Sequence, residues 1–392
     1  MMNIQRCAEE FKQQFTHSEY RLFFAPGRIN LIGEHTDYNG GHVFPCAITF
    51  GTYALAKKTS GNIIRVYSMN FPEKGIIEFP LTELDYRTED EWANYPKGVI
   101  RYLIEEGYNI TTGMDILFYG NIPNGAGLSS SASIEILTGV VAESLFALPI
   151  QRIDLIEIGK KVENNFIGVN SGIMDQFAIG MGKKDHGILL DCQTLTYDYA
   201  PIVLKDHNII IMNTNKRREL TDSGYNERRE QCEKALVALQ TKLPITSLGD
   251  LTNEMFEENK ELIPSPIWQK RAKHAVYENS RTLQALAALQ QGDLTKFGML
   301  MNASHISLRD DYEVTGIELD VLVETAWHHP GVIGARMTGA GFGGCAIAIV
   351  EKAQIDHFIE HIGTVYQNKI GYATTCYIAS IGDGAREITG GL

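Results

Sequence analysis

The pattern of apolar and polar positions predicts a first half rich in strands. Short apolar runs are separated by Gly and Asn turns, as expected for half-buried strands. We expect strands at Leu22–Ala25, His42–Ile48, Thr52–Lys57, Ile63–Met69 and Met114–Tyr119. Apolar residues at helical spacing predict helices at about residues 1–15, 95–106 and 153–166, and after the loop at 120–131.

Longer helical patterns dominate the second half. We expect helices near 222–241, 267–291, 294–304 and 353–367, and strands at 208–212, at both ends of 331–350 and near 373–380. Helices mixed with antiparallel strands indicate an α+β fold. A chain of 392 residues can form two cores. We therefore expect two domains, 1–200 and 201–392, although no obvious linker marks the boundary.

Composition narrows the classes of ligand and compartment. The net charge is −13 without any Lys/Arg-rich run, which disfavours nucleic acid and anionic membrane surfaces but does not exclude a phosphate ligand. No apolar run approaches the ~20 residues that a membrane span needs, and no signal peptide is apparent. Six scattered cysteines without a CxxC pair indicate reduced thiols. We expect a cytoplasmic protein.

Residues 26–41 concentrate polar side chains between glycines. They read PGRINLIGEHTDYNGG and include Arg28, Glu34, His35 and Asp37. The glycines allow sharp turns and close approach of the backbone to a ligand. Two carboxylates, an imidazole and an amide in so short a stretch can bind several hydroxyls, which suits a sugar. The alternative is a solvated hairpin loop, because Gly, Asn and Asp also form turns.

Residues 123–132 have the character of a phosphate loop. They read PNGAGLSSSA, between a predicted strand and a predicted helix. Small residues let backbone N–H groups converge on a phosphate, and the helix N-terminus adds donors and a positive dipole end. Three serine hydroxyls can bind phosphate oxygens or help hold a metal ion. The segment lacks the Gly-Lys-Ser/Thr ending of a Walker A loop. A serine-capped helix would need only one serine.

A third glycine cluster lies at 335–345 and reads ARMTGAGFGGC. Gly339, Gly341 and Gly344 match G-x-G-x-x-G, but a strand follows them instead of the helix that a dinucleotide-binding turn requires. We interpret the cluster as a turn between strands that brings backbone close to the ligand or to the serine loop. A plain hairpin is the alternative.

Together the three segments resemble the GHMP kinase superfamily, and the galactokinases in particular. Residues 26–41 are similar to the galactokinase signature, 123–132 to the superfamily's ATP loop and 334–345 to its third motif. The resemblance covers nearly the whole chain. It implies the two-domain α+β GHMP kinase fold, with the active site in the cleft between the domains. It also implies ATP- and Mg²⁺-dependent phosphorylation of the C1 hydroxyl of D-galactose, giving α-D-galactose 1-phosphate and ADP for the Leloir pathway.

The resemblance also implies roles for individual residues. Sugar-binding residues would be Glu34, His35, Thr36, Asp37, Gly172 and Tyr225. ATP-binding residues would be Ser68, Trp92, Tyr95, Gly125, Ala126, Gly127, Leu128, Ser129, Ser130 and Ser131. Asp175 would be the catalytic carboxylate with Arg28 beside it, Ser131 and Glu163 would help bind Mg²⁺, and Arg217 is a weaker candidate for a phosphate contact. The partners implied are D-galactose and ATP, with the chain acting as a monomer.

The chemistry can be argued from the residue types. Phosphoryl transfer needs positioning and charge stabilisation, and the acceptor hydroxyl must lose a proton, which a nearby carboxylate can take. An adjacent arginine keeps that carboxylate ionised and stabilises charge on the phosphoryl oxygens. Whether Asp175 is a true base or an orienting group stays open, and taken alone it could equally cap a helix or form a salt bridge.

Two other functions also stay open. One is a kinase of altered specificity, such as an N-acetylgalactosamine or arabinose kinase. The other is a catalytically silent regulator that binds sugar and ATP.

Overall fold

The computed structural model describes residues 4–123, 126–216 and 221–389. Its largest sheet has the strand order β13-β1-β3-β6-β4-β5, antiparallel except between β4 and β6. The strands are β1 (Arg21–Asn30), β3 (Pro45–Lys58), β4 (Ile63–Ser68), β5 (Ile77–Pro80), β6 (Met114–Gly120) and β13 (Arg386–Glu387). The first part of the glycine-rich segment 26–41 is therefore a strand.

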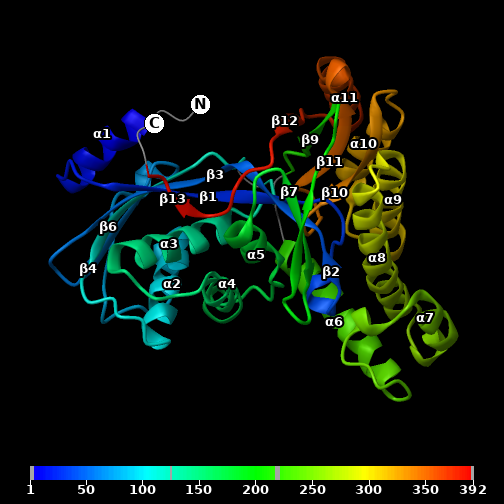
Figure 1. Ribbon diagram of the computed structural model, residues 1–392, viewed down its shortest axis with the longest axis horizontal. Coiled ribbons are helices and arrows are strands. Elements are labelled where there is room, and N and C mark those ends of the chain that lie inside the picture. Colours follow the sequence, from blue (N-terminus) through cyan, green and yellow to red (C-terminus); the bar gives the residue numbers. More distant parts are fainter. Residues whose placement is uncertain (1–3, 124–125, 217–220, 390–392) are drawn as a thin grey trace.

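Helices cover both faces of this sheet (Figure 1). They are α1 (Ile4–Phe15), α2 (Asn94–Glu105), α3 (Ser130–Phe146), α4 (Arg152–Lys161) and α5 (Met174–Met181). Side chains alternate between the faces: Leu22 packs with α1, whereas the next residue, Phe23, belongs to the cluster under α2–α5. The arrangement places α3 and α5 directly against β1.

A four-stranded sheet of order β10-β11-β9-β12 forms the second lobe. Its strands are β9 (His207–Asn213), β10 (Val332–Thr338), β11 (Cys345–Glu351) and β12 (Thr375–Ala379). Successive side chains of β9 point to opposite faces of the sheet and pack into two different hydrophobic cores. Ile209 and Ile211 pack with Ile29 and Phe44 of the first lobe, whereas Ile210 packs on the opposite face of the sheet. The two lobes therefore share one apolar core.

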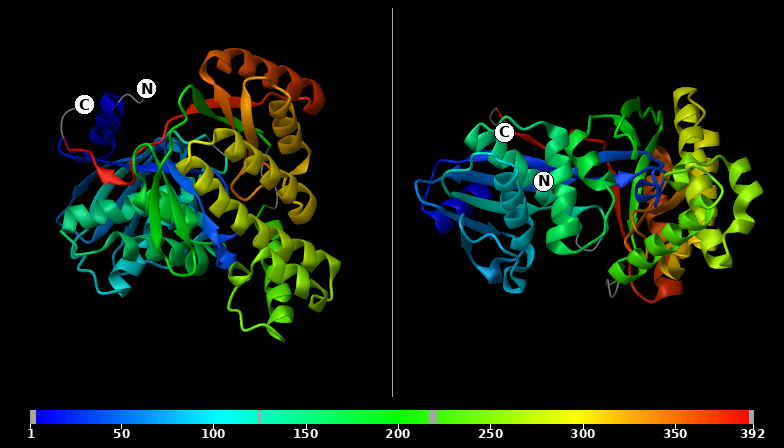
Figure 2. Two further views of the ribbon diagram at one scale, coloured as in Figure 1. Left: turned by 45° about the vertical axis from the view of Figure 1, so that its right-hand side comes forward. Right: turned by 90° about the horizontal axis from the view of Figure 1, so that it is seen from below.

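The remaining elements complete the second lobe and the joint between the lobes. A small sheet of order β2-β7-β8 consists of β2 (His42–Val43), β7 (His186–Asp191) and β8 (Tyr197–Pro201). The helices are α6 (Thr221–Gln240), α7 (Asn253–Asn259), α8 (Pro266–Gln290), α9 (Leu294–Ser307), α10 (Gly316–Trp327) and α11 (Ile355–Ile370). Figure 2 shows the two lobes from two further directions, with β1 and β3 extending from one lobe towards the other.

Most of the predicted elements are present, and one prediction is wrong. The segments 42–48 and 52–57 are not two strands split by a turn, because β3 runs unbroken through Gly51. A Cβ at Gly51 would lie 2.2 Å from the carbonyl oxygen of Ala25. The glycine therefore permits close strand packing instead of a turn. The pattern also missed the strands β5, β7, β8 and β13 and the helices α5, α7 and α10. A boundary at residue 200 stays a prediction; β13 nevertheless pairs with β1 of the first sheet.

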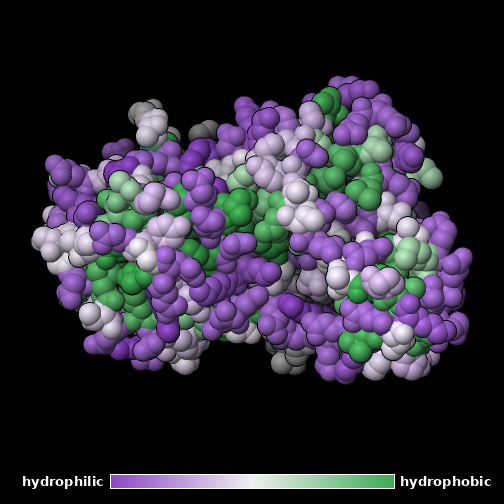
Figure 3. Space-filling model, turned by 60° about the horizontal axis from the view of Figure 1, so that its bottom comes forward, coloured by the Kyte–Doolittle hydropathy of each residue, from purple (hydrophilic) through white to green (hydrophobic). Residues whose placement is uncertain are grey.

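No helix among the described residues combines the length and the apolar character of a membrane span. On the face shown in Figure 3, hydrophilic residues separate the hydrophobic patches. Cys7, Cys46 and Cys232 are buried free thiols, in agreement with the sequence analysis.

Candidate active site

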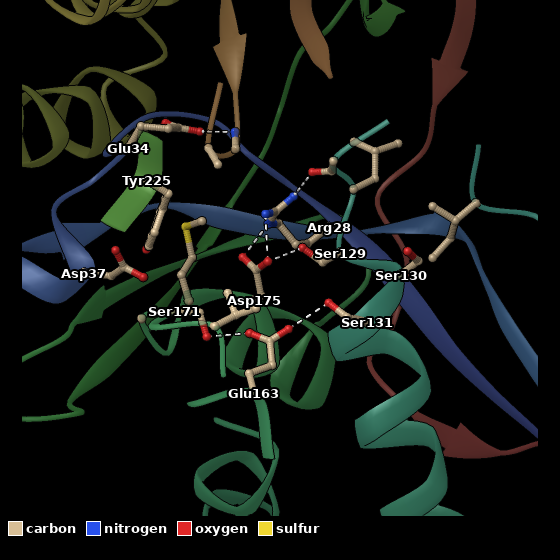
Figure 4. A pocket seen from close by; sticks show the side chains of 18 of the residues that line it. Arg28, Glu34, Asp37, Ser129, Ser130, Ser131, Glu163, Ser171, Asp175 and Tyr225 are labelled. Atoms are coloured by element: carbon tan, nitrogen blue, oxygen red, sulfur yellow. Dashed lines mark hydrogen bonds and ion pairs between the residues drawn. The ribbon is translucent and has the colours of Figure 1, made fainter. Parts of the chain in front are cut away.

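A cavity of about 360 Å³ lies where the three glycine-rich segments meet. Its lining includes Arg28, Glu34, His35, Asp37, Tyr95, Gly127, Leu128, Ser129, Ser130, Ser131, Glu163, Ser171, Gly172, Asp175, Tyr225, Gly339 and Ala340. An adjoining cavity of about 250 Å³ shares Tyr95, Ser130 and Ser131 with the first and adds Ser68 and Trp92. Figure 4 shows the polar side chains of the larger cavity converging around Asp175.

Arg28 and Asp175 form a bidentate ion pair at the centre of the cavity. Nε of Arg28 lies 2.8 Å from Oδ1 of Asp175, and Nη2 lies 2.8 Å from Oδ2. Arg28 follows an irregularity in the pairing of β1 with β3, and Asp175 lies in the first turn of α5. The third nitrogen, Nη1, donates to the carbonyl oxygen of Gly127 at 2.7 Å. The guanidinium is thereby held between the serine loop and the carboxylate.

Gly339 of the third glycine cluster closes over this pair. A Cβ on it would lie 3.1 Å from Gly127 O and 3.7 Å from Nη2 of Arg28, and its φ of +87° also favours glycine. Its N–H donates to Oε1 of Glu34 at 2.9 Å. The third cluster therefore brings backbone close to the serine loop, as its sequence predicts.

Glu34 belongs to a buried network of charges. Its Oε2 pairs with Arg336, which is 0% exposed, and accepts from Asn30 Nδ2 at 2.9 Å. Burial raises the pKa of Glu34, while the Arg336 guanidinium opposes that shift. Glu278 on α8 accepts from the Gly33 N–H at 3.0 Å. Burial acts to raise its pKa, but Arg281, His274 and Arg336 hold it at about 2. These bonds tie the first motif to α8 and β10.

His35 has both ring nitrogens engaged. Nε2 lies 3.2 Å from the carbonyl oxygen of Ala340, which can only accept, so Nε2 carries the hydrogen. Nδ1 then accepts from the hydroxyl of Tyr38 at 2.7 Å. Burial, together with the neighbouring His274, lowers the pKa of His35 to about 3. The imidazole is therefore neutral and fixed in one tautomer.

Asp37, Gly172 and Tyr225 lie together on one side of the cavity. A Cβ at Gly172 would stand 1.7 Å from Oδ2 of Asp37, so only glycine fits there. Burial and the nearby charge of Asp175 raise the pKa of Asp37. Burial also raises the pKa of Tyr225 well above its usual value, so its hydroxyl stays protonated. Together they offer a carboxylate, a phenol and a close backbone surface.

Two of the three serines at the start of α3 donate hydrogen bonds to different carboxylates. Ser129 donates to Oδ2 of Asp175, and Ser131 donates to Oε1 of Glu163 at 2.7 Å. Ser171 donates to the other oxygen of Glu163. Glu163 lies in a π-helical turn, Val162–Ile167, that continues α4. Burial raises its pKa, while the hydroxyls of Ser171 and Ser131 oppose the shift.

Known protein families match this arrangement of segments. The galactokinase galactose-binding signature matches residues 9–58, and the N- and C-terminal domains of GHMP kinases match 94–183 and 285–368. The galactokinase of Enterococcus faecalis is 61% identical over 96% of this chain and 98% of its own length. That of Ligilactobacillus salivarius is 59% identical over 97% and 98%. The chain belongs to the galactokinase family.

Solved structures agree with this membership. The Lactococcus lactis galactokinase complexed with galactose superposes with a TM-score of 0.97, at 52% identity, over 99% of this chain and 100% of that one. A mevalonate kinase from Methanococcus jannaschii, 18% identical with a TM-score of 0.66, shares the fold over 94% of this chain and 100% of its own. The chain therefore has the GHMP kinase fold of a galactokinase-family enzyme, and ATP is the co-substrate that the family implies.

Most residues predicted for a galactokinase site line one of the two cavities. Thr36 and Ala126 line neither. The Thr36 hydroxyl lies 2.8 Å from the carbonyl oxygen of Gly33 and 2.7 Å from that of His42, and its one hydrogen is shared between them. Ala126 is buried. Gly125 and Arg217 lie outside the described residues.

Sequence reasoning missed several contributors to the galactokinase-family site. Ser171 faces Glu163, Ala340 holds His35, and Arg336 neutralises Glu34. A signal existed for Arg336, because an arginine in an otherwise apolar strand must find a buried partner. Ser171 precedes Gly172 in the predicted segment 170–176, but nothing in its spacing indicates Glu163 as its partner.

Proposed function

We propose that this chain transfers the γ-phosphoryl group of ATP to the C1 hydroxyl of D-galactose, giving α-D-galactose 1-phosphate and ADP. The observation that carries the proposal is the Arg28–Asp175 pair, which lies in a cavity between the sugar signature and the serine loop. The galactose-bound relative from Lactococcus lactis, which superposes along the whole chain, supports galactose as the sugar.

Asp175 is the residue that accepts the proton of the C1 hydroxyl. Its carboxylate is ion-paired with Arg28 and partly open to the cavity, so a hydroxyl can reach it. The guanidinium of Arg28 stabilises negative charge on the transferring phosphoryl oxygens. In the same transfer step, Asp175 removes the proton and Arg28 stabilises the charge on the phosphoryl group.

The sugar occupies the side of the cavity that holds Asp37, Gly172 and Tyr225. Asp37 accepts hydroxyl hydrogens, and Tyr225 packs against or bonds the ring. Glu34 retains acceptor capacity on Oε1 beyond its bond from Gly339. His35 already bonds Tyr38 and Ala340, so it acts here mainly by holding the loop in shape.

ATP binds across the serine loop with its base in the adjoining cavity. The first backbone N–H groups of α3 and the Ser130 hydroxyl bind phosphate oxygens. Trp92, Tyr95 and Ser68 line the space for adenine. The indole Nε1 of Trp92 is buried and has no hydrogen-bond partner among the described residues, which suits an acceptor supplied by a ligand.

Ser131 and Glu163 hold Mg²⁺. Both oxygens of Glu163 already face serine hydroxyls, and such a set of hard oxygen donors fits this cation. Within the described residues, no cluster of three His, Cys, Asp or Glu side chains could hold a metal by itself. Ser131 and Glu163 would hold the ion together with the phosphate groups of ATP, and the ion would neutralise charge on those phosphates.

The chain acts as a monomer in this proposal, since one chain supplies every residue invoked. Light scattering at working concentration tests the monomer; a stable dimer would contradict it.

The test of function is ADP release with ATP, Mg²⁺ and a panel of galactose, N-acetylgalactosamine, glucose, arabinose, mevalonate and homoserine. Turnover greatest on galactose supports the proposal. Turnover greatest on another compound would support phosphoryl transfer from ATP but contradict the assignment of galactose as the acceptor. Galactose binding without any ADP would indicate the silent regulator.

A further inference from the structure

Ser129 occupies the N-cap position of α3 without capping the helix. Its side chain makes no hydrogen bond to the backbone N–H groups of the first turn, which is what an N-cap serine ordinarily does. Its hydroxyl instead donates to Oδ2 of Asp175. Its backbone is left-handed, at φ 62° and ψ 51°, an uncommon state for a residue with a side chain. The local structure thus holds this hydroxyl against the carboxylate and away from its usual partner.

The bonds to Asp175 leave its two oxygens unequal. Each carboxylate oxygen can accept two hydrogen bonds. Oδ2 accepts from Arg28 Nη2 and from Ser129, so its capacity is filled. Among the described residues, Oδ1 accepts only from Arg28 Nε, which leaves it one acceptor position. In Figure 4, Ser129 lies on one side of Asp175 and Asp37 and Tyr225 lie on the other.

We infer that Ser129 is a positioning residue that reserves Oδ1 of Asp175 for the proton of the acceptor hydroxyl. The inference rests on the proposed function. In the transfer step, the O–H bond of the C1 hydroxyl breaks and its proton goes to Oδ1. The hydroxyl oxygen forms a bond to the γ-phosphorus, and the bond from that phosphorus to the bridging oxygen breaks to release ADP. Ser129 keeps its own hydrogen throughout.

The neighbouring serine gives a matched comparison. Ser130 is exposed in the cavity, and its hydroxyl makes no hydrogen bond to any described residue. It is free to bind a phosphate oxygen, whereas the hydrogen of Ser129 is already committed. Loss of the two hydroxyls should therefore change different kinetic constants, although the residues are adjacent.

The experiment measures kcat and both KM values for Ser129→Ala, Ser129→Gly and Ser130→Ala. The Ser129 variants should lose roughly tenfold to a hundredfold in kcat, with the KM for ATP changed by less than about twofold. Ser130→Ala should instead raise the KM for ATP. Ser129→Gly tolerates the left-handed backbone, so equal losses in Ser129→Ala and Ser129→Gly assign the effect to the hydroxyl.

A second substrate separates positioning from general damage. Fluorine in 2-deoxy-2-fluoro-D-galactose makes the C1 hydroxyl more acidic and less dependent on the proton acceptor. The defect of Ser129→Ala, relative to the unsubstituted enzyme, should therefore be smaller on this sugar than on galactose. Equal defects on both sugars, or a rise in the KM for ATP matching that of Ser130→Ala, would overturn the inference. Full activity of Asp175→Asn would instead overturn the proposed role of Asp175, independently of the Ser129 data.

Discussion

Gly172 lies so close to Asp37 that a single methyl group cannot be placed between them. The Cβ of an alanine there would stand 1.7 Å from Oδ2 and 2.3 Å from Cγ of Asp37. The Gly172→Ala change must displace the Asp37 carboxylate from the cavity. We expect the KM for galactose to rise by about tenfold or more, with a smaller effect on the KM for ATP. Steady-state kinetics with each substrate varied in turn measure both.

The control for this change is Gly363→Ala on α11. A Cβ there would meet nothing within 4 Å, so both KM values should stay unchanged. An unchanged KM for galactose in Gly172→Ala would show that Asp37 does not depend on this contact.

Removal of the Asp175 carboxylate should leave a folded protein without useful turnover. The side chain is 27% exposed in a polar cavity, so its loss creates no apolar void. We expect Asp175→Ala to lower kcat by about 10²- to 10⁴-fold, as for loss of a general base. Circular dichroism checks the fold, and calorimetry checks that galactose still binds. Substantial retained turnover would contradict the assigned role.

Ser131→Ala should raise the Mg²⁺ concentration needed for half-maximal rate more than it raises the KM for galactose. The Ser131 hydroxyl donates a hydrogen bond to Glu163 at 2.7 Å, and the change removes this hydroxyl from the proposed metal shell. Titration of the rate with Mg²⁺ at fixed ATP measures the effect. Ser144→Ala, further along the same helix and outside both cavities, serves as the control. An unchanged Mg²⁺ dependence would remove Ser131 from the metal shell.

The buried carboxyl of Glu135 on α3 should make stability depend on pH. Burial raises its pKa well above the ordinary value, with Glu163 adding to the shift, and its Oε1 has no partner among the described residues. The folded protein therefore keeps a proton here that the unfolded chain releases, so stability falls as pH rises above the unfolded value near 4.5.

Glu135→Gln removes this dependence, because an amide does not ionise. It should raise the melting temperature by a few degrees more at pH 8 than at pH 5, measured by scanning calorimetry. Glu157 on α4 is exposed, so Glu157→Gln should change the melting temperature by the same amount at both pH values. An equal gain for Glu135→Gln at both pH values would contradict the expectation.

The sequence predicts the fold class and the glycine-rich site because these rest on local patterns. The strand before residue 26, the helix after the serine loop and the strand after the third cluster follow from short-range spacing. The prediction of a turn at Gly51 is wrong because glycine is needed there for close packing of the strand against Ala25, and this contact between strands cannot be seen in the local pattern. The short helix α5 was missed, although Asp175 lies on it, because eight residues give little periodic signal.

Side-chain partners were the least predictable part of the site. The sequence indicates three serines near a phosphate, but Ser129 bonds a residue 46 positions away. His35 was expected to bind hydroxyls, yet Tyr38 and Ala340 occupy both its nitrogens. Such pairings depend on which elements meet in space, and no spacing along the chain encodes them directly.

Pairing of β13 with β1 bears on how the molecule is synthesised. Arg21 and Glu387 are 366 residues apart in the sequence, and their side chains bond across these two strands. The strand that carries Arg28 therefore lacks one neighbour until residue 387 has left the ribosome. Until then its edge is open to pairing with other nascent chains. A chaperone that covers this edge during translation would act on the same strand that carries Arg28.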